Sequence, residues 1–236
     1  MFSKSEALYD AIYEWKDYKA ESALLLDFIA CHKSAPGSSL LDVACGTGGH
    51  IPFLRETCTI EGLDLDPAML EIANRKCPGV RFHSGDMLDF DLGKTFDAVV
   101  SLFSSIGYMK TPERLTRAAG TMARHVGRGG VLIIEPFFLP EAWKPRTKAP
   151  GVNLVDRPDI TIVRMSDWVR RDNLIVWTFH YLVGTPEKVE HFTELHEIAL
   201  FTDAEYRAAF AAAGMTVTHD AEGLTGRGLY IGTWPQ

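Results

Sequence analysis

The sequence has few cysteines and no long apolar run. Its 236 residues hold only Cys31, Cys45, Cys58 and Cys77, far apart and without a C-x-x-C pair. Neither a zinc site nor a disulfide framework is predicted, and we expect no bound metal. No apolar run reaches the roughly 18 residues of a membrane span, and no signal-peptide pattern is present. These features favour a cytoplasmic protein without a membrane partner.

Positive charge is scarce and scattered. The chain carries 24 Lys and Arg against 31 Asp and Glu, a formal net charge of −7, and its longest basic block is Arg170-Arg171. A nucleic-acid partner is not expected, because binding to phosphate backbones needs clustered positive charge. Repeats and low-complexity segments are also lacking. With 46% hydrophobic residues, the length suits one large α/β domain with an insertion.

The most informative stretch is the glycine-rich segment S-L-L-D-V-A-C-G-T-G-G-H at residues 39–50. Its apolar first half predicts a buried strand that runs into a tight turn and then a helix from near Gly49. Gly46 and Gly48 lack the Cβ atoms that would keep a ligand away from the backbone. Asp42 lies near the strand end. The pattern predicts a nucleotide-type pocket at the carboxyl end of the first strand of a doubly wound α/β sheet.

The glycine spacing distinguishes between classes of nucleotide-binding loop. A dinucleotide loop, G-x-G-x-x-G, needs a third glycine where Ile51 stands, and a P-loop needs a lysine where His50 stands. The stretch D-V-A-C-G-T-G at residues 42–48 instead resembles motif I of the class I S-adenosylmethionine (SAM) methyltransferases. The resemblance implies S-adenosyl-L-methionine as cofactor and S-adenosylhomocysteine as product, with Ala44 in the binding turn. The alternative is a glycine-rich turn of some other α/β protein.

Acidic residues mark the ends of the next two predicted strands. Asp64 ends the strand 59–64, about 20 residues beyond the glycines, where a carboxylate accepts hydrogen bonds from both ribose hydroxyls. A helix cap is the alternative, but Asp66 before a proline already serves that purpose. In methyltransferases of this fold, the acid at the position of Asp86 accepts from the adenine amino group. The remaining candidates for cofactor binding are Tyr18, Leu65, Met69, Met87 and Phe103.

Two helices are predicted at the N-terminus, over residues 5–16 and 18–33, because apolar residues recur there at helical spacing. Tyr13 and Tyr18 stand among these apolar residues. Such tyrosines ordinarily serve amphipathic packing. In the SAM methyltransferases, however, the segment before motif I commonly covers the cofactor site. We therefore expect ligand contact by Tyr13 or Tyr18 as much as simple packing.

The remaining strands complete a Rossmann-like sheet with an insertion. Strands at 39–43, 59–64, 80–83, 96–100, 131–134, 215–219 and 228–233 make seven, with helices at 49–55, 112–126 and 204–213. Residues 136–150 hold four prolines and are interpreted as an irregular functional segment. Three alternating segments, 160–169, 174–183 and 189–200, predict an inserted antiparallel three-strand sheet. The chain thus divides into a SAM-binding core with lid helices (1–136), an inserted part of the acceptor site (137–200) and a final helix with two strands (201–236).

Four later stretches narrow the resemblance. They are S-S-I-G-Y at 104–108, E-P-F-F-L-P at 135–140, H-Y-L-V at 180–183 and T-G-R-G-L at 225–229. From about Tyr9 to the C-terminus, the chain resembles the dTDP-amino-sugar N,N-dimethyltransferases of deoxysugar and antibiotic biosynthesis, such as those making desosamine and mycaminose. Two departures lie near the expected acceptor site. Phe137-Phe138 replaces Trp-Trp, and the glycine-rich segment before K-D-Y is shortened to residues 14–18.

The resemblance implies methyl transfer to the amino group of a nucleotide-linked sugar. An amine must shed a proton before each attack, and Tyr13, Tyr108 and His180 are the candidates to accept it or to orient the amine, none as an obligatory base. Arg227, between two glycines, suits a phosphate, because its fork-shaped guanidinium has open backbone around it. The alternative role of Arg227 is to cap a hairpin. For His180 and His196 the alternative is packing within a strand. The substrate-binding candidates are Phe137, Phe138, Tyr181, His196 and Arg227.

Other functions compete with this one. A small-molecule O- or N-methyltransferase with a non-nucleotide acceptor would share the fold. A regulatory subunit that binds SAM without catalysis would not need an aromatic-lined acceptor side. An NAD-dependent dehydrogenase is disfavoured by the missing third glycine. The expected partner is a small molecule, and the sequence leaves monomer and homodimer open.

Overall fold

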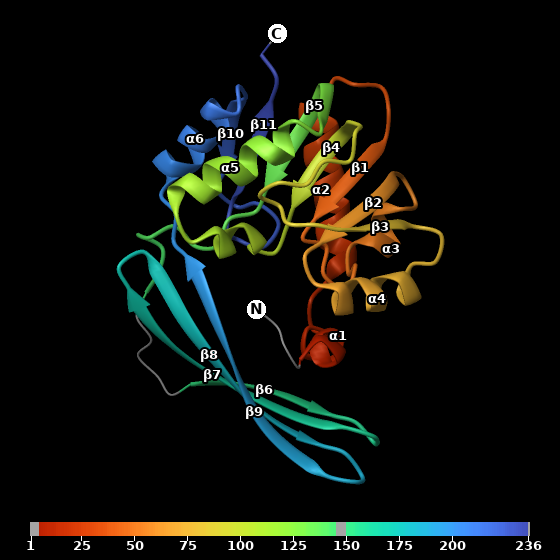
Figure 1. Ribbon diagram of the computed structural model, residues 1–236, viewed down its shortest axis with the longest axis vertical. Coiled ribbons are helices and arrows are strands. Elements are labelled where there is room, and N and C mark those ends of the chain that lie inside the picture. The colour runs from red at the N-terminus through yellow and green to blue at the C-terminus, as the bar shows by residue number, and fades with distance from the viewer. Residues whose placement is uncertain (1–4, 145–149, 236) are drawn as a thin grey trace.

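Two sheets organise the chain, whose computed structural model describes residues 5–144 and 150–235 (Figure 1). Sheet A has seven strands in the order β10-β11-β5-β4-β1-β2-β3, and only β11 runs antiparallel to its neighbours. This is the seven-stranded sheet predicted from the sequence. Its strands are β1 (Ser39–Val43), β2 (Thr59–Asp64), β3 (Arg81–Ser84), β4 (Phe96–Ser101), β5 (Val126–Ile134), β10 (Thr216–Asp220) and β11 (Leu229–Thr233).

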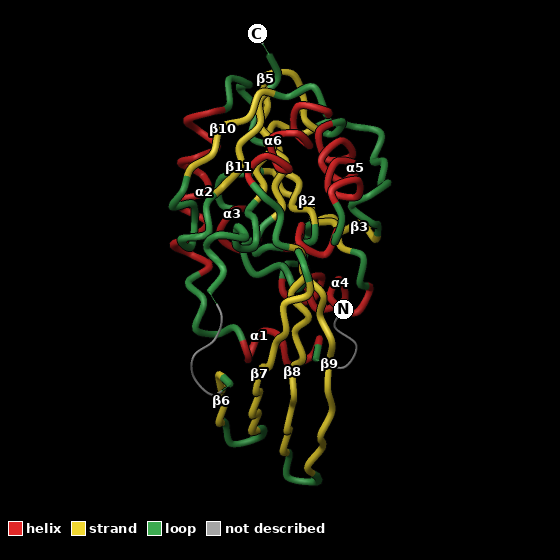
Figure 2. The backbone as a smooth tube through the Cα atoms, turned by 90° about the vertical axis from the view of Figure 1, so that its left-hand side faces the viewer, coloured by secondary structure: helices red, strands yellow, loops and turns green. Residues whose placement is uncertain are grey.

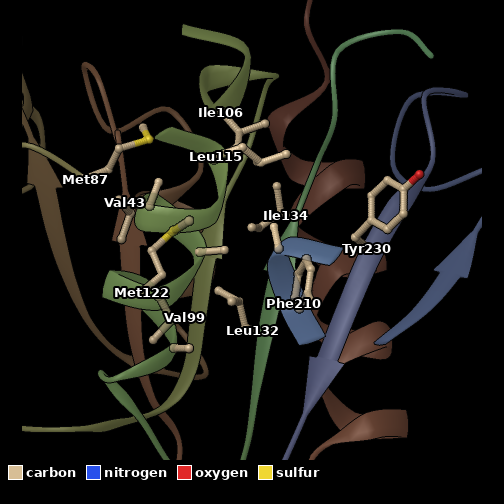
Figure 3. Packing of buried hydrophobic residues seen from close by; sticks show 14 of the residues in the cluster. Val43, Met87, Val99, Ile106, Leu115, Met122, Leu132, Ile134, Phe210 and Tyr230 are labelled. Carbon is tan, nitrogen blue, oxygen red and sulfur yellow. The ribbon is translucent and has the colours of Figure 1, made fainter. Parts of the chain in front are cut away.

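Helices cover both faces of sheet A, because alternate residues of its central strands carry apolar side chains to opposite sides. Leu132 and Ile134 of β5 point to one face, where α5 (Pro112–Ala123) and α6 (Asp203–Ala212) bring Met122 and Phe210 onto them (Figure 3). The other face packs against α2 (Tyr18–His32) through Leu25 and its neighbours. The short α3 (Ile51–Leu54) and α4 (Pro67–Lys76) flank β2. The core thus holds the strand ends in fixed positions.

The N-terminal helices differ from the prediction. The helix expected over 5–16 is only a 3₁₀ turn, η1 (Glu6–Leu8), followed by α1 (Tyr9–Ile12). The chain leaves the helix at Tyr13 because Asp17 starts α2, accepting a hydrogen bond from the backbone N–H of Ala20 at 2.9 Å. The helix expected over 49–55 is likewise shortened to α3.

Sheet B is antiparallel, with the order β6-β7-β8-β9. Its strands are β6 (Gly151–Asp156), β7 (Thr161–Arg171), β8 (Leu174–Gly184) and β9 (Val189–Ala199). The three-strand prediction is therefore wrong by one strand. Because β6 is a short edge strand with no buried residue, its sequence lacks the buried alternation that marks the other three. Sheet B falls within the expected insertion, 137–200, and lies beside α1 and the 3₁₀ turn η2 (Ser105–Met109) (Figures 1 and 2).

The two faces of sheet B have different surroundings. One face, with Phe179 and Tyr181, packs against Ile12 of α1 and its neighbours. We call the other the open face. It exposes the large apolar side chains Val152, Leu154, Met165, Val169, Leu182, Val189 and Leu195, which the strand register places on one side. Among the described residues, no helix is long and apolar enough to cross a membrane.

Candidate active site

A cavity of about 350 Å³ lies at the ends of β1, β2 and β3, between them and η2. A smaller one adjoins it, since Tyr9, Ala44, Gly46 and Ser105 line both. The sequence-predicted cofactor residues on the larger cavity are Ala44, Gly46, Asp64, Leu65, Met69, Asp86 and Met87, and Tyr18, Asp42 and Phe103 line the smaller. Of that set only Gly48 lines neither, because its positive φ of 73° serves the turn and a Cβ there would meet Ile51 and Ala73.

The turn after β1 is tied to the end of β2. The Ala44 N–H donates to the Leu63 carbonyl at 2.7 Å, and the Gly46 N–H donates to Asp64 Oδ2 at 2.7 Å. Asp64 Oδ1 accepts from the Asp66 N–H at 2.9 Å. A Cβ on Gly46, whose φ is +55°, would meet nothing within 4 Å. The turn therefore leaves open space beside a carboxylate that is already oriented.

The two carboxyl groups at the β1 and β2 ends are poorly solvated. Burial, together with the nearby Asp64 charge, raises the pKa of Asp42 to about 8. Burial also raises the pKa of Asp64, although backbone N–H groups of Asp66 and Gly46 oppose this. A ligand that brings positive charge to this end of the cavities is therefore favoured.

A buried ionic network lies behind the wall of the smaller cavity, which it reaches through His50. Lys16 Nζ lies 2.5 Å from both Glu21 carboxylate oxygens, and His50 Nε2 lies 2.9 Å from Glu21 Oε2. Burial opposes ionisation of Glu21, but hydrogen bonds from His50 and Lys16 give a net lowering of its pKa. The His50 ring meets Tyr18 edge-on at 4.9 Å between centroids, and Lys16 Nζ lies 4.2 Å from the Phe103 ring centroid. The network thus fixes Tyr18 and Phe103.

The Tyr18 ring is also fixed by the glycine turn. A Cβ on Gly49 would come within 2.5 Å of Tyr18 Cε1. The last glycine of the motif therefore makes room for this lid residue. Sequence reasoning identified Tyr18 and the turn separately, but not this contact between them.

Aromatic rings and two arginines gather around Phe103, which lines the smaller cavity. Tyr13 meets Phe103 edge-on at 5.3 Å, and Arg164 of β7 donates to the Tyr13 hydroxyl at 3.1 Å. The Arg227 guanidinium lies 5.3 Å from the Phe103 ring centroid and 5.6 Å from that of Phe138. Arg227 also donates to Ser104 Oγ at 2.8 Å. Arg227 is therefore part of the aromatic wall and more than a hairpin cap.

Glu135 connects three of the sequence motifs. It is fully buried, and its Oε2 accepts from the Phe103 N–H at 2.6 Å while its Oε1 accepts from the Thr225 hydroxyl at 2.7 Å. Phe103 and Ser104 both have positive φ, 53° and 67°. The Glu135 carboxylate thus holds a strained turn beside the T-G-R-G-L segment.

The structure separates the remaining substrate and catalytic candidates. Tyr108 lines the larger cavity, and His196 is buried behind it with Nδ1 2.6 Å from the Tyr108 oxygen. Phe137 and Tyr181 are buried in packing clusters and line neither cavity. Tyr13, Phe138 and Arg227 do not line a cavity either and reach the site through Phe103. Of the segment 136–150, residues 145–149 lie outside the described residues.

His180 requires a correction. It lies on the open face of sheet B, exposed and stacked on His191 at 6.4 Å between ring centroids, and it lines neither cavity. Adjacent strand residues point to opposite faces, so burial of Tyr181 turns His180 outward. The catalytic role expected of His180 is therefore contradicted by its position.

Sequence reasoning missed several residues of the site. Tyr9 lines both cavities, and Lys16, Glu21 and Arg164 hold rings around them. Glu21 meets His50 and Arg164 meets Tyr13 across long stretches of the chain, so no local motif marks these contacts. Within the described ranges, no group of three or more His, Cys, Asp or Glu residues could hold a metal. Activity without a metal stays a prediction.

Residues 40–130 match the family described as "Methyltransferase domain". Three curated relatives span nearly the whole chain. The dTDP-3-amino-3,4,6-trideoxy-alpha-D-glucopyranose N,N-dimethyltransferase of Streptomyces venezuelae is 43% identical over 95% of both chains. The dTDP-3-amino-3,6-dideoxy-alpha-D-glucopyranose enzyme of Streptomyces fradiae is 41% identical, over 95% of this chain and 89% of its own. The dTDP-4-amino-2,3,4,6-tetradeoxy-D-glucose enzyme of Saccharopolyspora spinosa is 37% identical, over 95% and 90%.

Solved structures agree with these relatives. DesVI of Streptomyces venezuelae superimposes with a TM-score of 0.90 at 40% identity, over all of both chains. SAM-bound CalS10, an amino pentose methyltransferase from Micromonospora echinaspora, superimposes with a TM-score of 0.85 at 37% identity, over 100% of this chain and 98% of its own. With that level of identity over nearly its whole length, the chain is a methyltransferase and belongs to the family of the dTDP-amino-sugar N,N-dimethyltransferases.

Proposed function

We propose that the chain transfers methyl groups from SAM to the amino group of a dTDP-linked deoxyamino sugar. The observation that carries this proposal is that cavities lined by aspartates adjoin a group of aromatic rings that holds Arg227. The smaller cavity, which adjoins the larger one with Asp64 and Asp86, is lined by Asp42 and by Phe103, and Phe103 belongs to the aromatic wall that presents Arg227. Relatives at 37–43% identity act on dTDP-amino sugars. We also propose a cytoplasmic location, which the four unpaired cysteines support.

The residues of the two cavities fit SAM by the chemistry of their donors and acceptors. Asp64 suits the ribose hydroxyls, and Asp86 with the Met87 N–H suits the adenine edge. Asp42 suits the ammonium of the methionine part, since a buried carboxyl gains from a nearby cation. Apolar contact would come from Leu65, Met69 and Phe103, while Tyr18 closes the smaller cavity.

When bound, SAM supplies a methyl group on a positively charged sulfur. The chain's own task is to hold the acceptor amine in line and to exclude water, which supplies several kcal/mol of the barrier. Tyr9, Tyr13 and Phe103 provide the dry surroundings. Burial raises the pKa of Tyr108 far above its usual range, so Tyr108 stays a neutral phenol that orients the amine by a hydrogen bond.

The sugar diphosphate needs a local cation in an acidic protein. Arg227 uses one of its five donors on Ser104, which leaves the others for phosphate oxygens. Phe138 packs beside the guanidinium, and His196 would act only through Tyr108. We therefore assign Arg227 to the diphosphate and Phe138 to the acceptor wall.

A substrate panel tests the proposal. Purified protein is incubated with SAM and either dTDP-3-amino sugars, dTDP-4-amino sugars or free amines, and methylated products are identified by mass spectrometry. We expect methylation of a dTDP-amino sugar, and the panel will tell which amine position is used and whether one or two methyl groups are added. Methylation of only free amines or hydroxyl groups would favour the alternative, a small-molecule methyltransferase with a non-nucleotide acceptor.

The Arg227→Met variant tests the diphosphate assignment. Loss of a charge-assisted contact costs about 1.5–3 kcal/mol, so the acceptor KM should rise roughly tenfold or more with little change in kcat. Methionine keeps an apolar stem of similar length, which separates the loss of charge from the loss of packing. Arg128→Met, an exposed arginine at the far end of β5, is the matched control and should behave as wild type. An unchanged acceptor KM in Arg227→Met would place the diphosphate elsewhere.

A further inference from the structure

Behind Tyr108 lies a row of buried polar groups. The Tyr108 oxygen is 2.6 Å from His196 Nδ1, and His196 Nε2 is 3.7 Å from Glu194 Oε2. Ser5 donates its hydroxyl to Glu194 Oε2 at 2.7 Å and its N–H to Oε1 at 3.2 Å. His196 is 1% exposed and Glu194 4%. Only Tyr108, at one end, lines the cavity.

The protonation states along this row follow from its chemistry. Burial lowers the pKa of His196 to about 4, against the opposing effect of Glu194, so the imidazole is neutral near pH 7. A neutral imidazole has one N–H, and its other nitrogen can only accept. Glu194, a carboxylate that Ser5 approaches with two donors, can only accept as well. The N–H must therefore be on Nε2, which faces Glu194.

The tautomer of His196 determines the direction of the Tyr108 hydroxyl. With the proton on Nε2, Nδ1 accepts, so the Tyr108 hydroxyl must donate to it and points away from the cavity. The phenol oxygen then presents only lone pairs to a ligand. If the hydroxyl pointed inward instead, it would donate to the lone pair of the acceptor amine, which is the electron pair that must attack.

We propose that Glu194 is a positioning residue that, through His196, fixes the Tyr108 oxygen as a hydrogen-bond acceptor for the N–H of the substrate amine. This inference rests on the proposed function, because it concerns an amine nucleophile. An amine N–H bound to Tyr108 leaves its nitrogen lone pair free to face the methyl donor. Glu194 lies in β9, two residues from His196 and on the same face, and no sequence motif marks it.

The imidazole tautomer is the first test and needs no substrate. Nitrogen-15 NMR of the wild-type protein distinguishes a protonated from a bare ring nitrogen. We expect His196 with a proton on Nε2 and a bare Nδ1. In Glu194→Gln, the amide can donate to Nε2 and should move the proton to Nδ1. A wild-type ring protonated on Nδ1 would overturn the proposal even if no dTDP-amino sugar were ever methylated.

A double-mutant comparison is the second test. Glu194→Gln should lower kcat about tenfold or more, with the acceptor KM and the SAM Kd little changed, because the amine is misoriented after binding. In a Tyr108→Phe background, which has no hydroxyl to misdirect, the same Glu194→Gln change should have almost no further effect on kcat. Equal losses in both backgrounds would show that Glu194 acts on folding alone.

Glu194→Asp provides the conservative rescue. It keeps an anionic acceptor facing Nε2, so the tautomer should stay as in wild type and kcat should stay within a few-fold of it. If Glu194→Gln fails to fold, Glu194→Asp still tests the proposal through its tautomer and kcat. An aspartate variant with the wild-type tautomer but the kcat loss of Glu194→Gln would contradict the proposal.

Discussion

At the residue scale, two carboxyl groups determine the charge of the cofactor cavities. Asp64 is oriented by the backbone N–H groups of Gly46 and Asp66, while Asp42 is buried with no cation beside it among the interactions of the described residues. Both therefore gain from a cationic, hydroxyl-rich ligand.

Asp64→Ala should weaken SAM binding by about 1.5–3 kcal/mol, or roughly 10- to 150-fold in Kd, because the ribose would lose its charged acceptor. Titration calorimetry gives the Kd. Asp64→Asn keeps an oxygen for the Gly46 N–H and so separates loss of charge from damage to the turn. If folded Asp64→Ala bound SAM normally, the ribose assignment would be wrong.

The raised pKa of Asp42 makes SAM binding depend on pH. Below its pKa of about 8 the free protein holds a proton on Asp42, and a bound ammonium favours the carboxylate, so binding releases that proton. Affinity should rise with pH, by up to about tenfold per unit, and level off above pH 8. Calorimetry in buffers of different ionisation enthalpy counts the released proton. Asp42→Asn should release none, and a flat wild-type profile would contradict this.

Sequence reasoning found the residues whose place follows from local pattern. An acid at a strand end, such as Asp64, must lie at the carboxyl edge of a parallel sheet. The alternation in β8 showed that His180 and Tyr181 face opposite ways, but alternation does not tell which face will be covered. Glu21 and Glu194 have partners up to 189 residues away, and only the fold brings such groups together.

At the element scale, Glu135 joins the loop after β4, the end of β5 and the turn before β11. Both of its carboxylate oxygens accept hydrogen bonds in a site without solvent. The E-P-F-F-L-P and T-G-R-G-L motifs are therefore neighbours for a physical reason.

Glu135→Gln should lower stability by about 1–3 kcal/mol, because an amide can accept at one oxygen only and leaves a buried donor unpaired. For a chain of this size the melting temperature should fall by roughly 2–12 °C. Differential scanning calorimetry measures the change. Thr225→Val removes one of the two contacts and should cost less. A melting temperature equal to wild type would mean that the Phe103 turn holds without the carboxylate.

Elements were predictable where burial leaves a periodic pattern. Sheet A and the strands β7 to β9 carry that pattern. β6 was missed because it is a short edge strand whose alternating apolar residues, Val152 and Leu154, are exposed rather than buried. The helix expected over 5–16 was cut short because Asp17 begins a new one.

At the scale of the whole molecule, the exposed large apolar side chains gather on the open face of sheet B. It carries seven of the ten large apolar side chains that are exposed among the described residues. Four strands about 4.8 Å apart, with about 3.4 Å per residue, give a face on the order of 700 Å². A stable interface buries about 800 Å² per partner, so a second copy packed face to face fits.

We expect a homodimer in solution and measure it by analytical ultracentrifugation. Leu182→Asp, on the open face near the end of β8, should shift the population to monomer, because a charge would be buried against apolar groups. Leu24→Asp, on the exposed side of α2, is the control and should not. A monomeric wild-type protein at micromolar concentration would refute this assignment.

Sheet B leaves the core after Phe137 and returns to it at Leu200, and both residues belong to one buried cluster. A segment whose two ends meet can be exchanged without rethreading the chain. The sheet supplies Arg164 and, through His196, the support of Tyr108, whereas Asp42, Asp64 and Asp86 come from β1, β2 and the residues after β3. If sheet B helps to select the sugar as proposed, changes confined to this one inserted segment would alter acceptor recognition and leave the SAM site unchanged.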